Sequence, residues 1–160
     1  MIRPAEASDL GQVAAIYADQ VEHGTATFDT TAPSPSSWAA KANDSSPGHH
    51  LLVAADGPDV LGFCYSVAYR PRGAYATTKE TSIYLAEAAR GRGVGRALYG
   101  RLIDLLRADR MHTVIAVIAS SNPASAALHR SLGFAQVGTL RQVGDKFGRR
   151  IDTDLWQLML

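Results

Sequence analysis

The sequence predicts an α/β fold, in which a mixed sheet and several helices form one domain over residues 1–160. Three observations support this prediction. Apolar residues recur with strand spacing in some stretches and with helical spacing in others. The elements follow in the order strand, two helices, three strands, helix, strand, helix and two strands, which differs from a plain βαβ repeat. No linker, internal repeat or low-complexity tract divides the chain, and its length suits a single core.

The N-terminal part is predicted to contain one short strand and two helices. Residues 1–5 can form a strand that ends at Pro4. Ser8 and Asp9 are good N-cap residues for a helix that continues to about residue 22. The apolar face of this helix comprises Leu10, Val13, Ile16, Tyr17 and Val21. Residues 38–43 are expected to form the second helix, and the long loop 23–37 before it, rich in Pro, Ser, Thr and Gly, is a candidate functional loop.

Three strands are predicted in the middle of the chain. Residues 50–55 and 60–69 flank the turn Asp-Gly-Pro-Asp, which is typical of a hairpin, and residues 78–85 follow after an interruption. Cys64, the only cysteine, lies in the second of these strands and is expected to be a core residue rather than a nucleophile. A single cysteine excludes a disulfide within the chain and favours a reducing, cytoplasmic location.

The C-terminal part is predicted to alternate helices with strands. One helix begins near residue 94, with apolar residues at Val94, Leu98, Leu102, Leu105 and Leu106. Residues 113–119 read as a buried strand. Asn122 can cap the next helix, Pro123 suits its first position, and Gly133 ends it. Residues 135–144 and 152–160 are the last two strands, joined around a turn at 146–150.

Composition and charge exclude several classes of protein. The chain is 46% hydrophobic and 19% charged, which is typical of globular proteins, and its net charge of +1 gives no global field that would attract nucleic acid. The first residues lack the features of a signal peptide, and no apolar run approaches the roughly 20 residues that a spanning helix needs. We therefore expect neither a nucleic-acid nor a membrane partner, and no metal.

The stretch RGRGVGRAL, residues 90–98, is the strongest local signal for a binding site. Gly91, Gly93 and Gly95 each cost roughly 0.5–1 kcal/mol relative to alanine in regular structure, which indicates a close approach of the backbone to something else. The loop joins a predicted strand to a predicted helix and so offers N–H groups and a positive dipole end to an anion. Positive charge is added by Arg90, Arg92 and Arg96. A phosphate or pyrophosphate is the expected ligand group, and a solvated basic turn that only caps the helix is the alternative.

Two common phosphate-binding motifs do not fit this loop. A Walker A loop requires Lys and then Ser or Thr after its last glycine, but Gly95 is followed by Arg96 and Ala97. The dinucleotide-binding pattern G-x-G-x-x-G fails as well, because its last position holds Arg96 when counted from Gly91 and Leu98 when counted from Gly93.

A different pair of segments does fit. Arg90 to Gly95 match R-x-x-G-x-G, and NPASAALHRSLGF, residues 122–134, matches N-x-x-[AS]-x-x-x-[YH]-x-x-x-G-F. At this separation the two segments resemble the GCN5-related N-acetyltransferase (GNAT) superfamily. A narrower resemblance, to the phosphinothricin and methionine sulfoximine acetyltransferases, rests on ATFDTTAPS, YRPRGAY, TKETSIYL and LRQVGDKFGRRIDTDLWQL. The resemblance implies the GNAT fold, a mixed, mostly antiparallel central sheet of about seven strands flanked by about four helices.

The resemblance also implies acetyl-CoA as cosubstrate and assigns the residues that bind it. The glycine loop would hold the pyrophosphate, and the pantetheine arm would pair along the fourth strand like an added strand. The N–H of Leu85 would stabilise the thioester oxygen, while Asn122 would bond the pantetheine, cap its helix or do both. Ser125 would contact the phosphate region. The implied set is Ile83, Tyr84, Leu85, Arg90, Gly91, Arg92, Gly93, Val94, Gly95, Arg96, Asn122 and Ser125.

Two side chains are predicted to act in catalysis beside the Leu85 N–H. An ammonium group has no lone pair to attack with, so a base is needed, and Glu80 is the candidate, directly or through a water. A carboxylate in a half-buried strand is costly to keep without a purpose, although Glu80 could instead pair with an arginine or lie on a solvated face. Glu87 is a rival in an ordinary loop. His129 could protonate the departing thiolate, or it could only hydrogen-bond CoA or a carbonyl.

The acceptor implied by the resemblance is a small L-amino acid or analogue, acetylated on its α-amino group. Its carboxylate favours an arginine as bidentate partner, and Arg72 is the predicted clamp unless it is an exposed loop residue. The predicted substrate-binding set is Phe28, Arg72, Gly73, Ala74, Tyr75 and Glu80. This chain departs from the subgroup at Gly73, where proline is frequent, and at Lys79, where an apolar residue is usual.

Assembly and two further functions follow from the same comparison. The resemblance implies a homodimer in which residues 146–150 approach the partner's active site, and a solvated hairpin end is the alternative. Acetylation of a protein N-terminus or another small amine stays open, but the aromatic and basic stretch beside Glu80 differs from the acidic groove expected there. A non-catalytic CoA-binding regulator also stays open, and Glu80 and His129 beside the glycine loop argue against it.

Overall fold

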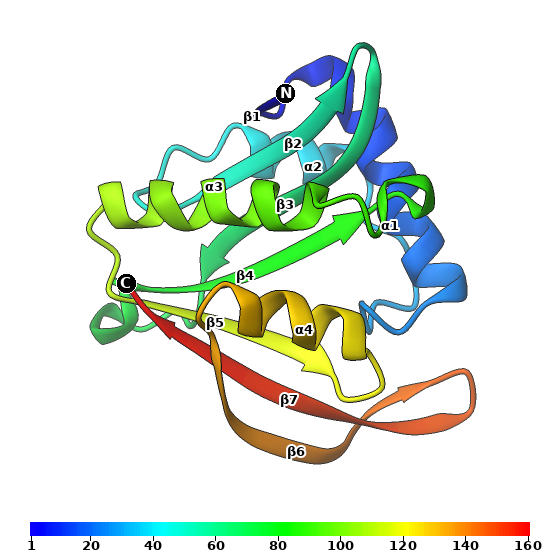
Figure 1. The fold of residues 1–160 in the computed structure, drawn as a ribbon, viewed down its shortest axis with the longest axis vertical. Helices are drawn as coiled ribbons and strands as arrows, with labels where there is room; N and C mark the ends of the chain where they lie inside the picture. The colour runs from blue at the N-terminus through cyan, green and yellow to red at the C-terminus, as the bar shows by residue number, and fades with distance from the viewer.

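The computed structural model describes all 160 residues as one seven-stranded sheet with helices on both faces (Figure 1). The strands are β1 (Ile2–Pro4), β2 (His50–Asp56), β3 (Asp59–Ala68), β4 (Thr78–Leu85), β5 (Thr113–Ala119), β6 (Ala135–Lys146) and β7 (Arg149–Met159). The helices are α1 (Leu10–His23), α2 (Pro35–Ala42), α3 (Val94–Ala108) and α4 (Pro123–Ser131). The predicted fold class and the predicted order of elements are both confirmed. No helix is long and apolar enough to cross a membrane.

The sheet has the order β1-β2-β3-β4-β5-β7-β6, and every neighbouring pair is antiparallel except β4 and β5. The parallel pair is short, because only Thr78–Glu80 of β4 face Thr113–Ile115 of β5. Beyond Glu80 and Ile115 the two strands separate, and Figure 1 shows them diverging in the middle of the sheet. The divergence leaves the second half of β4 with a partner on one side only.

Two apolar cores lie on opposite faces of the sheet. The core under α3 and α4 contains Leu98, Leu102, Leu106, Phe134 and Trp156. The core under α1 and α2 is mostly aromatic and contains Tyr17, Trp38, Phe63 and Tyr84. Ring pairs within it meet edge-on or stacked at centroid distances of 4.9–5.3 Å, which favours a single arrangement of α1 on the sheet.

Several boundaries differ from those predicted. Helix α2 begins at Pro35 instead of residue 38, because Ser34 accepts a hydrogen bond from the Ser37 N–H and Pro35 takes the first helical position. Asp9 does precede α1, but its carboxylate binds the Arg3 guanidinium instead of capping the helix through its side chain. The C-terminal strands are longer than predicted, and the turn between them shrinks to two residues.

That turn consists of Phe147 and Gly148, which both have positive φ, of 54° and 68°. Two consecutive residues of this kind form the tight hairpin turn whose twist matches that of the flanking strands. Lys146 and Arg149 are therefore paired strand residues instead of turn residues. The hairpin β6–β7 extends past the rest of the sheet, and its tip points toward the end of α1 (Figure 1).

Candidate active site

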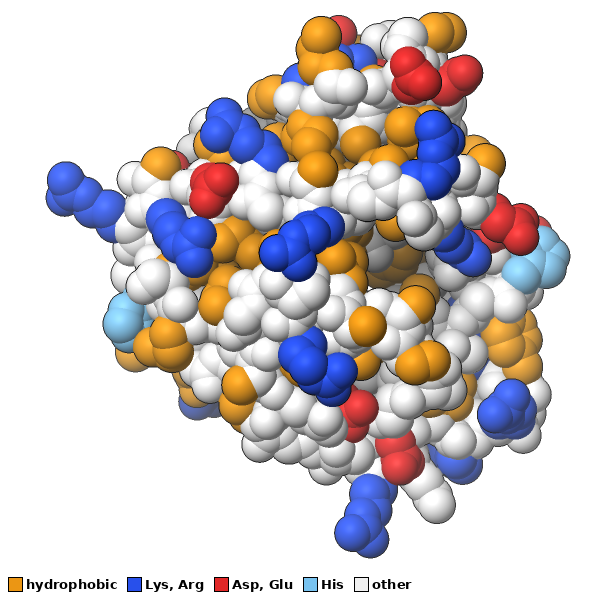
Figure 2. All heavy atoms as spheres, in the orientation of Figure 1, with side chains coloured by type: hydrophobic (Ala, Val, Ile, Leu, Met, Phe, Trp, Pro, Cys, Tyr) orange, Lys and Arg blue, Asp and Glu red, His pale blue; other side chains and the backbone are white.

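The candidate site is a pocket of about 470 Å³ that forms where β4 and β5 separate. Both faces of β4 contribute to its wall: Thr81, Ile83 and Leu85 from one face, and Ser82 and Tyr84 from the other. Since alternate residues of a strand point to opposite faces, the pocket passes through the sheet instead of lying on one side of it. Figure 2 shows an apolar hollow with basic side chains around its mouth. The volume is that of a small-molecule site.

The open edge of β4 presents backbone groups to this pocket. The Ala86 N–H donates to the Leu61 carbonyl of β3 at 3.0 Å, and the Thr77 carbonyl accepts from the His112 N–H on the other side at 2.8 Å. The pairing of β3 with β4 has no irregularity, so the backbone groups of Ile83 and Leu85 point into the gap by alternation. Ile83 and Leu85 at this edge can therefore pair with an extended ligand as with an added strand, whereas the backbone groups of Tyr84, the third residue predicted to do so, point toward β3.

The glycine loop closes one end of the pocket. Gly91 and Gly93 have φ of 73° and 80°, which a residue with a side chain adopts only with strain. Gly93 is the N-cap of α3 and no side chain caps the helix, so the first N–H groups of α3 have no partner within the helix. A Cβ on Gly95 would lie 3.1 Å from Leu85 Cδ1 and 3.5 Å from Leu128 Cδ2, so a glycine here keeps the pocket open.

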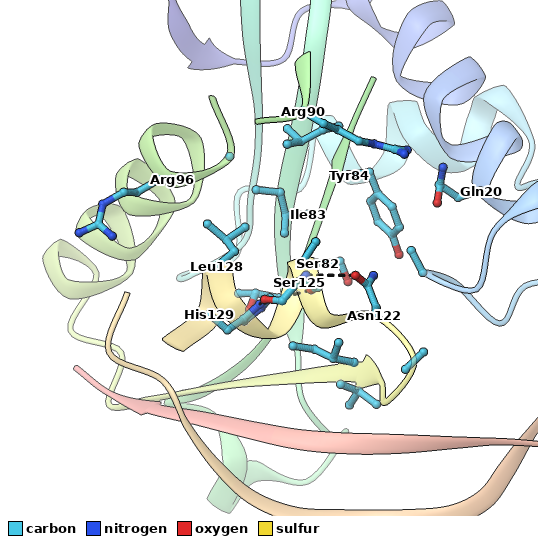
Figure 3. A pocket seen from close by; sticks show the side chains of 18 of the residues that line it. Gln20, Ser82, Ile83, Tyr84, Arg90, Arg96, Asn122, Ser125, Leu128 and His129 are labelled. Atoms are coloured by element: carbon cyan, nitrogen blue, oxygen red, sulfur yellow. Dashed lines mark hydrogen bonds between the residues drawn. The ribbon is translucent and has the colours of Figure 1, made fainter. Parts of the chain in front are cut away.

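The three arginines of the loop have different roles. Arg90 and Arg96 line the pocket, whereas Arg92 and Val94, also predicted, do not. The Arg96 guanidinium donates to the Ser131 carbonyl at 3.0 Å and links α3 to α4. In Figure 3 the Arg90 side chain extends across the pocket toward Gln20. The unpaired N–H groups, the helix dipole and Arg90 together make this end of the pocket suited to an anion.

Asn122, Ser125 and His129 come from the start and the body of α4. Asn122 Oδ1 accepts from the Ser125 N–H at 3.0 Å, so its predicted capping role is present, and the bond is drawn in Figure 3. His129 is 3% exposed and lines the pocket. Its Nδ1 lies 2.8 Å from the Ser125 carbonyl and must donate to it, so the neutral ring has only Nε2 left as an acceptor, 3.1 Å from the Tyr99 hydroxyl. Burial lowers the pKa of His129 and favours this neutral form.

Glu80 lies at the point where β4 and β5 begin to separate, but it is not among the pocket-lining residues. It shares a strand face with Ser82 and Tyr84, which do line the pocket. Burial raises the pKa of Glu80, and the positive charge of Arg70 opposes that shift. Glu87 is exposed in a short turn after β4.

None of the other predicted acceptor residues lines the pocket: four of them lie in the loop between β3 and β4, and Phe28 lies in the loop between α1 and α2. Arg72, Gly73, Ala74 and Tyr75 are all exposed. The charge that acts on Glu80 belongs to Arg70, whose guanidinium carbon lies 5.0 Å from the centre of the Tyr69 ring. Tyr69 in turn meets Tyr75 edge-on at 5.4 Å. Lys79 is buried on the opposite face of β4, against Gly48 and Met111, so this departure from the subgroup does not reach the Glu80 face.

Sequence reasoning missed part of the wall. Gln20 of α1 and Ala26 of the following loop line the pocket, as do Val117, Ile118 and Ala119 at the end of β5 and Leu128 of α4. The β5 residues could have been expected, because the strand after a separation must supply the facing wall. Gln20 carries no such signal, since it lies in an amphipathic helix among ordinary polar residues.

Comparison with known proteins agrees with this geometry. Residues 2–155 match the family described as Acetyltransferase (GNAT) domain. The chain is 41% identical to a phosphinothricin N-acetyltransferase of Streptomyces coelicolor, over 94% of this chain and 91% of that protein. It is 39% identical to an L-methionine sulfoximine/L-methionine sulfone acetyltransferase of Pseudomonas paraeruginosa, over 99% and 94%. A phosphinothricin acetyltransferase of Sinorhizobium meliloti, solved with acetyl-CoA, superimposes with a TM-score of 0.94 at 39% identity, over 100% of this chain and 88% of that one.

Proposed function

The chain belongs to the GNAT acetyltransferase family, an acetyl-CoA-dependent group of N-acetyltransferases, and from this premise we propose that its acceptor is the α-amino group of a small L-amino acid or analogue. Amino acids of the phosphinothricin, methionine sulfoximine and methionine sulfone type are the proposed class. The observation that carries the proposal is the pocket through the sheet. It lets a donor on the α3–α4 side and an amine on the α1–α2 side meet in the gap between β4 and β5.

On the donor side the residues present fit acetyl-CoA. The N-terminus of α3 with Arg90 offers an anion site for the pyrophosphate, and the free edge of β4 offers backbone groups for the pantetheine arm. Acetyl-CoA supplies the activated acetyl thioester. The Leu85 N–H, which points into the gap, is proposed to donate to the thioester oxygen as negative charge develops on it.

On the acceptor side Glu80 is proposed as the base that takes the proton of the attacking ammonium, directly or through one water. A raised pKa brings a carboxylate closer to the working pH and makes it a better proton acceptor than an ordinary glutamate. The neutral amine then bonds to the acetyl carbon and the carbon–sulfur bond breaks. The second proton that the nitrogen loses passes to the departing thiolate through solvent, which gives the N-acetyl product and free CoA. Because the single N–H of neutral His129 is used by the Ser125 carbonyl, we assign His129 the hydrogen-bonding role and not that of the acid.

Arg70 and Arg72 are proposed to bind the acceptor carboxylate. The positive charge of Arg70 acts on Glu80. Arg72, the residue predicted from sequence, is exposed and therefore accessible to an acceptor. Tyr75 and Phe28 are 38% and 36% exposed, so each can contribute an apolar surface to an incoming side chain.

A homodimer in the cytoplasm completes the proposal. The edge strand β6 carries exposed Val137, Leu140 and Val143, and Phe147 is exposed at its turn, a group of apolar side chains that favours a protein partner. The single cysteine is buried and forms no disulfide, which is compatible with a reducing compartment. Sedimentation at several concentrations tests the dimer.

The acceptor is tested by thiol release from acetyl-CoA across a panel of amines. The panel contains phosphinothricin, methionine sulfoximine, methionine sulfone, the twenty amino acids, polyamines and short peptides. Turnover confined to small L-amino acids and analogues supports the proposal. Preference for peptides or polyamines, or silence across the panel while acetyl-CoA still binds, overturns it.

A further inference from the structure

The turn-proximal residue Lys146 makes a set of contacts that neither the donor site nor the catalytic residues use. It is 4% exposed although it lies next to the tip of a hairpin. Its ammonium donates to three backbone carbonyls of the same chain, those of Gln20 at 3.0 Å, Gly24 at 2.8 Å and Thr27 at 2.9 Å. Three donors therefore meet three acceptors, and the ammonium is fully satisfied away from water.

These carbonyls belong to the end of α1 and the loop after it. Gly24 is the C-cap of α1, and the Gln20 carbonyl lies in the last turn of that helix. The Gln20 carbonyl also accepts from the Gly24 N–H at 3.1 Å. The last carbonyls of a helix carry partial negative charge, so a cation placed there stabilises the helix end. Lys146 acts as a capping group supplied from 122 residues beyond Gly24. Burial lowers its pKa, and the charge of Asp29 opposes that shift.

The segment that Lys146 holds forms the α1 side of the pocket. Gln20 and Ala26 line the pocket, and both lie within the segment 20–28. The Thr27 hydroxyl is 2.7 Å from the Tyr17 hydroxyl, and the Tyr17 ring meets pocket-lining Tyr84 edge-on at 4.9 Å. Through these contacts a shift of the loop would move residues on the pocket wall.

A second contact ties the same two segments together. A Cβ on Gly144 of β6 would lie 2.3 Å from Phe28 Cε2, so the Phe28 ring rests directly on the hairpin backbone. The hairpin therefore contacts segment 20–28 in two places, through the Lys146 ammonium and through the packing of Phe28 on Gly144. All three hydrogen bonds of the Lys146 ammonium go to this segment, and none goes to the glycine loop or to α4.

We infer that Lys146 is a positioning residue for acceptor binding: by capping α1 it fixes segment 20–28 as the acceptor-side wall of the pocket. The inference rests on the proposed function in one respect, namely that the amine enters from the α1–α2 side. It separates the two halves of the site, since loss of the Lys146 contacts should loosen the acceptor wall and leave the acetyl-CoA site unchanged.

The test uses Lys146→Met, which keeps the length of the side chain but removes the charge and the donors. Lys146→Arg is the conservative variant, and Lys146→Gln replaces Lys146→Met if that protein does not fold. The matched control is Lys79→Met. Lys79 is also a buried lysine, but it lies on the face of β4 opposite Glu80 and does not line the pocket. Acceptor KM, acetyl-CoA Kd and hydrogen exchange of the amides of residues 20–28 are measured for each.

The expected result is a rise of about tenfold or more in acceptor KM for Lys146→Met, equivalent to roughly 1.4 kcal/mol, with acetyl-CoA Kd changed less than about twofold. Amides of residues 20–28 should exchange faster, Lys146→Arg should recover part of the loss, and Lys79→Met should behave as wild type. Equal changes in acceptor KM and acetyl-CoA Kd, or faster exchange with acceptor KM unchanged, overturn the inference. Hydrogen exchange is measured without an acceptor, so it can be interpreted even if the proposed acceptor is wrong. Unchanged amide exchange of residues 20–28 in Lys146→Met overturns the inference. A wild-type enzyme that acetylates no amino acid overturns the proposed acceptor instead.

Discussion

The two sides of the pocket are built from different material. The donor side consists mainly of backbone: the free edge of β4, the positive-φ glycines and the N-terminus of α3. The acceptor side consists of side chains and of the loop in segment 20–28, which is held by Tyr17 of α1 and by Lys146 and Gly144 of the distant C-terminal hairpin. A backbone site is fixed by a few neighbouring residues, whereas a site assembled from distant parts depends on tertiary contacts. The donor side is therefore expected to tolerate little local change, and the acceptor side to vary more readily.

The strongest test of this comparison is a substitution of Glu80, the residue proposed to act where the two sides meet. Glu80→Gln removes the base but keeps the shape of the side chain, and kcat should fall by about 10²–10⁴-fold with acetyl-CoA Kd unchanged. The exposed Glu87→Gln is the control and should retain wild-type kcat. A Glu80→Gln enzyme with wild-type kcat would remove Glu80 from the chemistry and leave the amine to lose its proton to water.

The donor side is tested by adding one methyl group to its backbone. Gly95→Ala places a Cβ 3.1 Å from Leu85 Cδ1, so acetyl-CoA Kd should rise by about tenfold, or roughly 1.4 kcal/mol. Acceptor KM should change less. Gly11→Ala is the matched control, because Gly11 is also helical and a Cβ there meets nothing within 4 Å. Isothermal titration with acetyl-CoA distinguishes them, and equal affinity for both variants would contradict a tight donor wall.

The acceptor side is tested by its two arginines. Arg70→Ala and Arg72→Ala should each raise acceptor KM, and the residue that binds the carboxylate should cost about 10–100-fold, the value of a hydrogen bond to a charged group. Acetyl-CoA KM should stay constant in both. The proximity of Arg70 to Glu80 favours the larger effect at Arg70. If neither variant alters acceptor KM, carboxylate recognition lies elsewhere.

The smallest expected effect concerns stability. The pKa of Glu80 is higher in the folded protein than in the unfolded protein, so ionisation of Glu80 opposes folding. This loss of stability begins as the pH rises above the unfolded-state pKa and is complete once the pH exceeds the folded-state pKa. Glu80→Gln should therefore match the wild-type Tm near pH 4 and exceed it by a few degrees at pH 7. Thermal melts at the two pH values check this, and a lower Tm for Glu80→Gln at pH 7 would indicate that Glu80 stabilises the fold through a partner.

The contrast also explains which features could be predicted from the sequence. The glycine loop and Asn122 were predicted because their roles follow from a few adjacent residues and from backbone conformation. The order of elements was predicted because periodicity reports burial locally. Gln20 was missed, and Lys146 was placed in a turn, because what each does depends on a contact between segments more than a hundred residues apart. His129 was found as a site residue, but its tautomer depends on Tyr99 and on the Ser125 carbonyl and could not be deduced from spacing.

The free edge of β4 has a consequence for the end of the catalytic cycle. The donor side grips the pyrophosphate and the pantetheine arm, and acetyl transfer leaves both of these unchanged. These contacts contribute the same binding free energy to acetyl-CoA before the reaction and to CoA after it, so they do not help CoA to dissociate. Free CoA should therefore compete strongly with acetyl-CoA, and the ratio of the two in the cell would govern how fast the enzyme works. Because the pocket binds the parts that acetyl-CoA and CoA share, turnover is expected to depend on the fraction of the CoA pool that is acetylated.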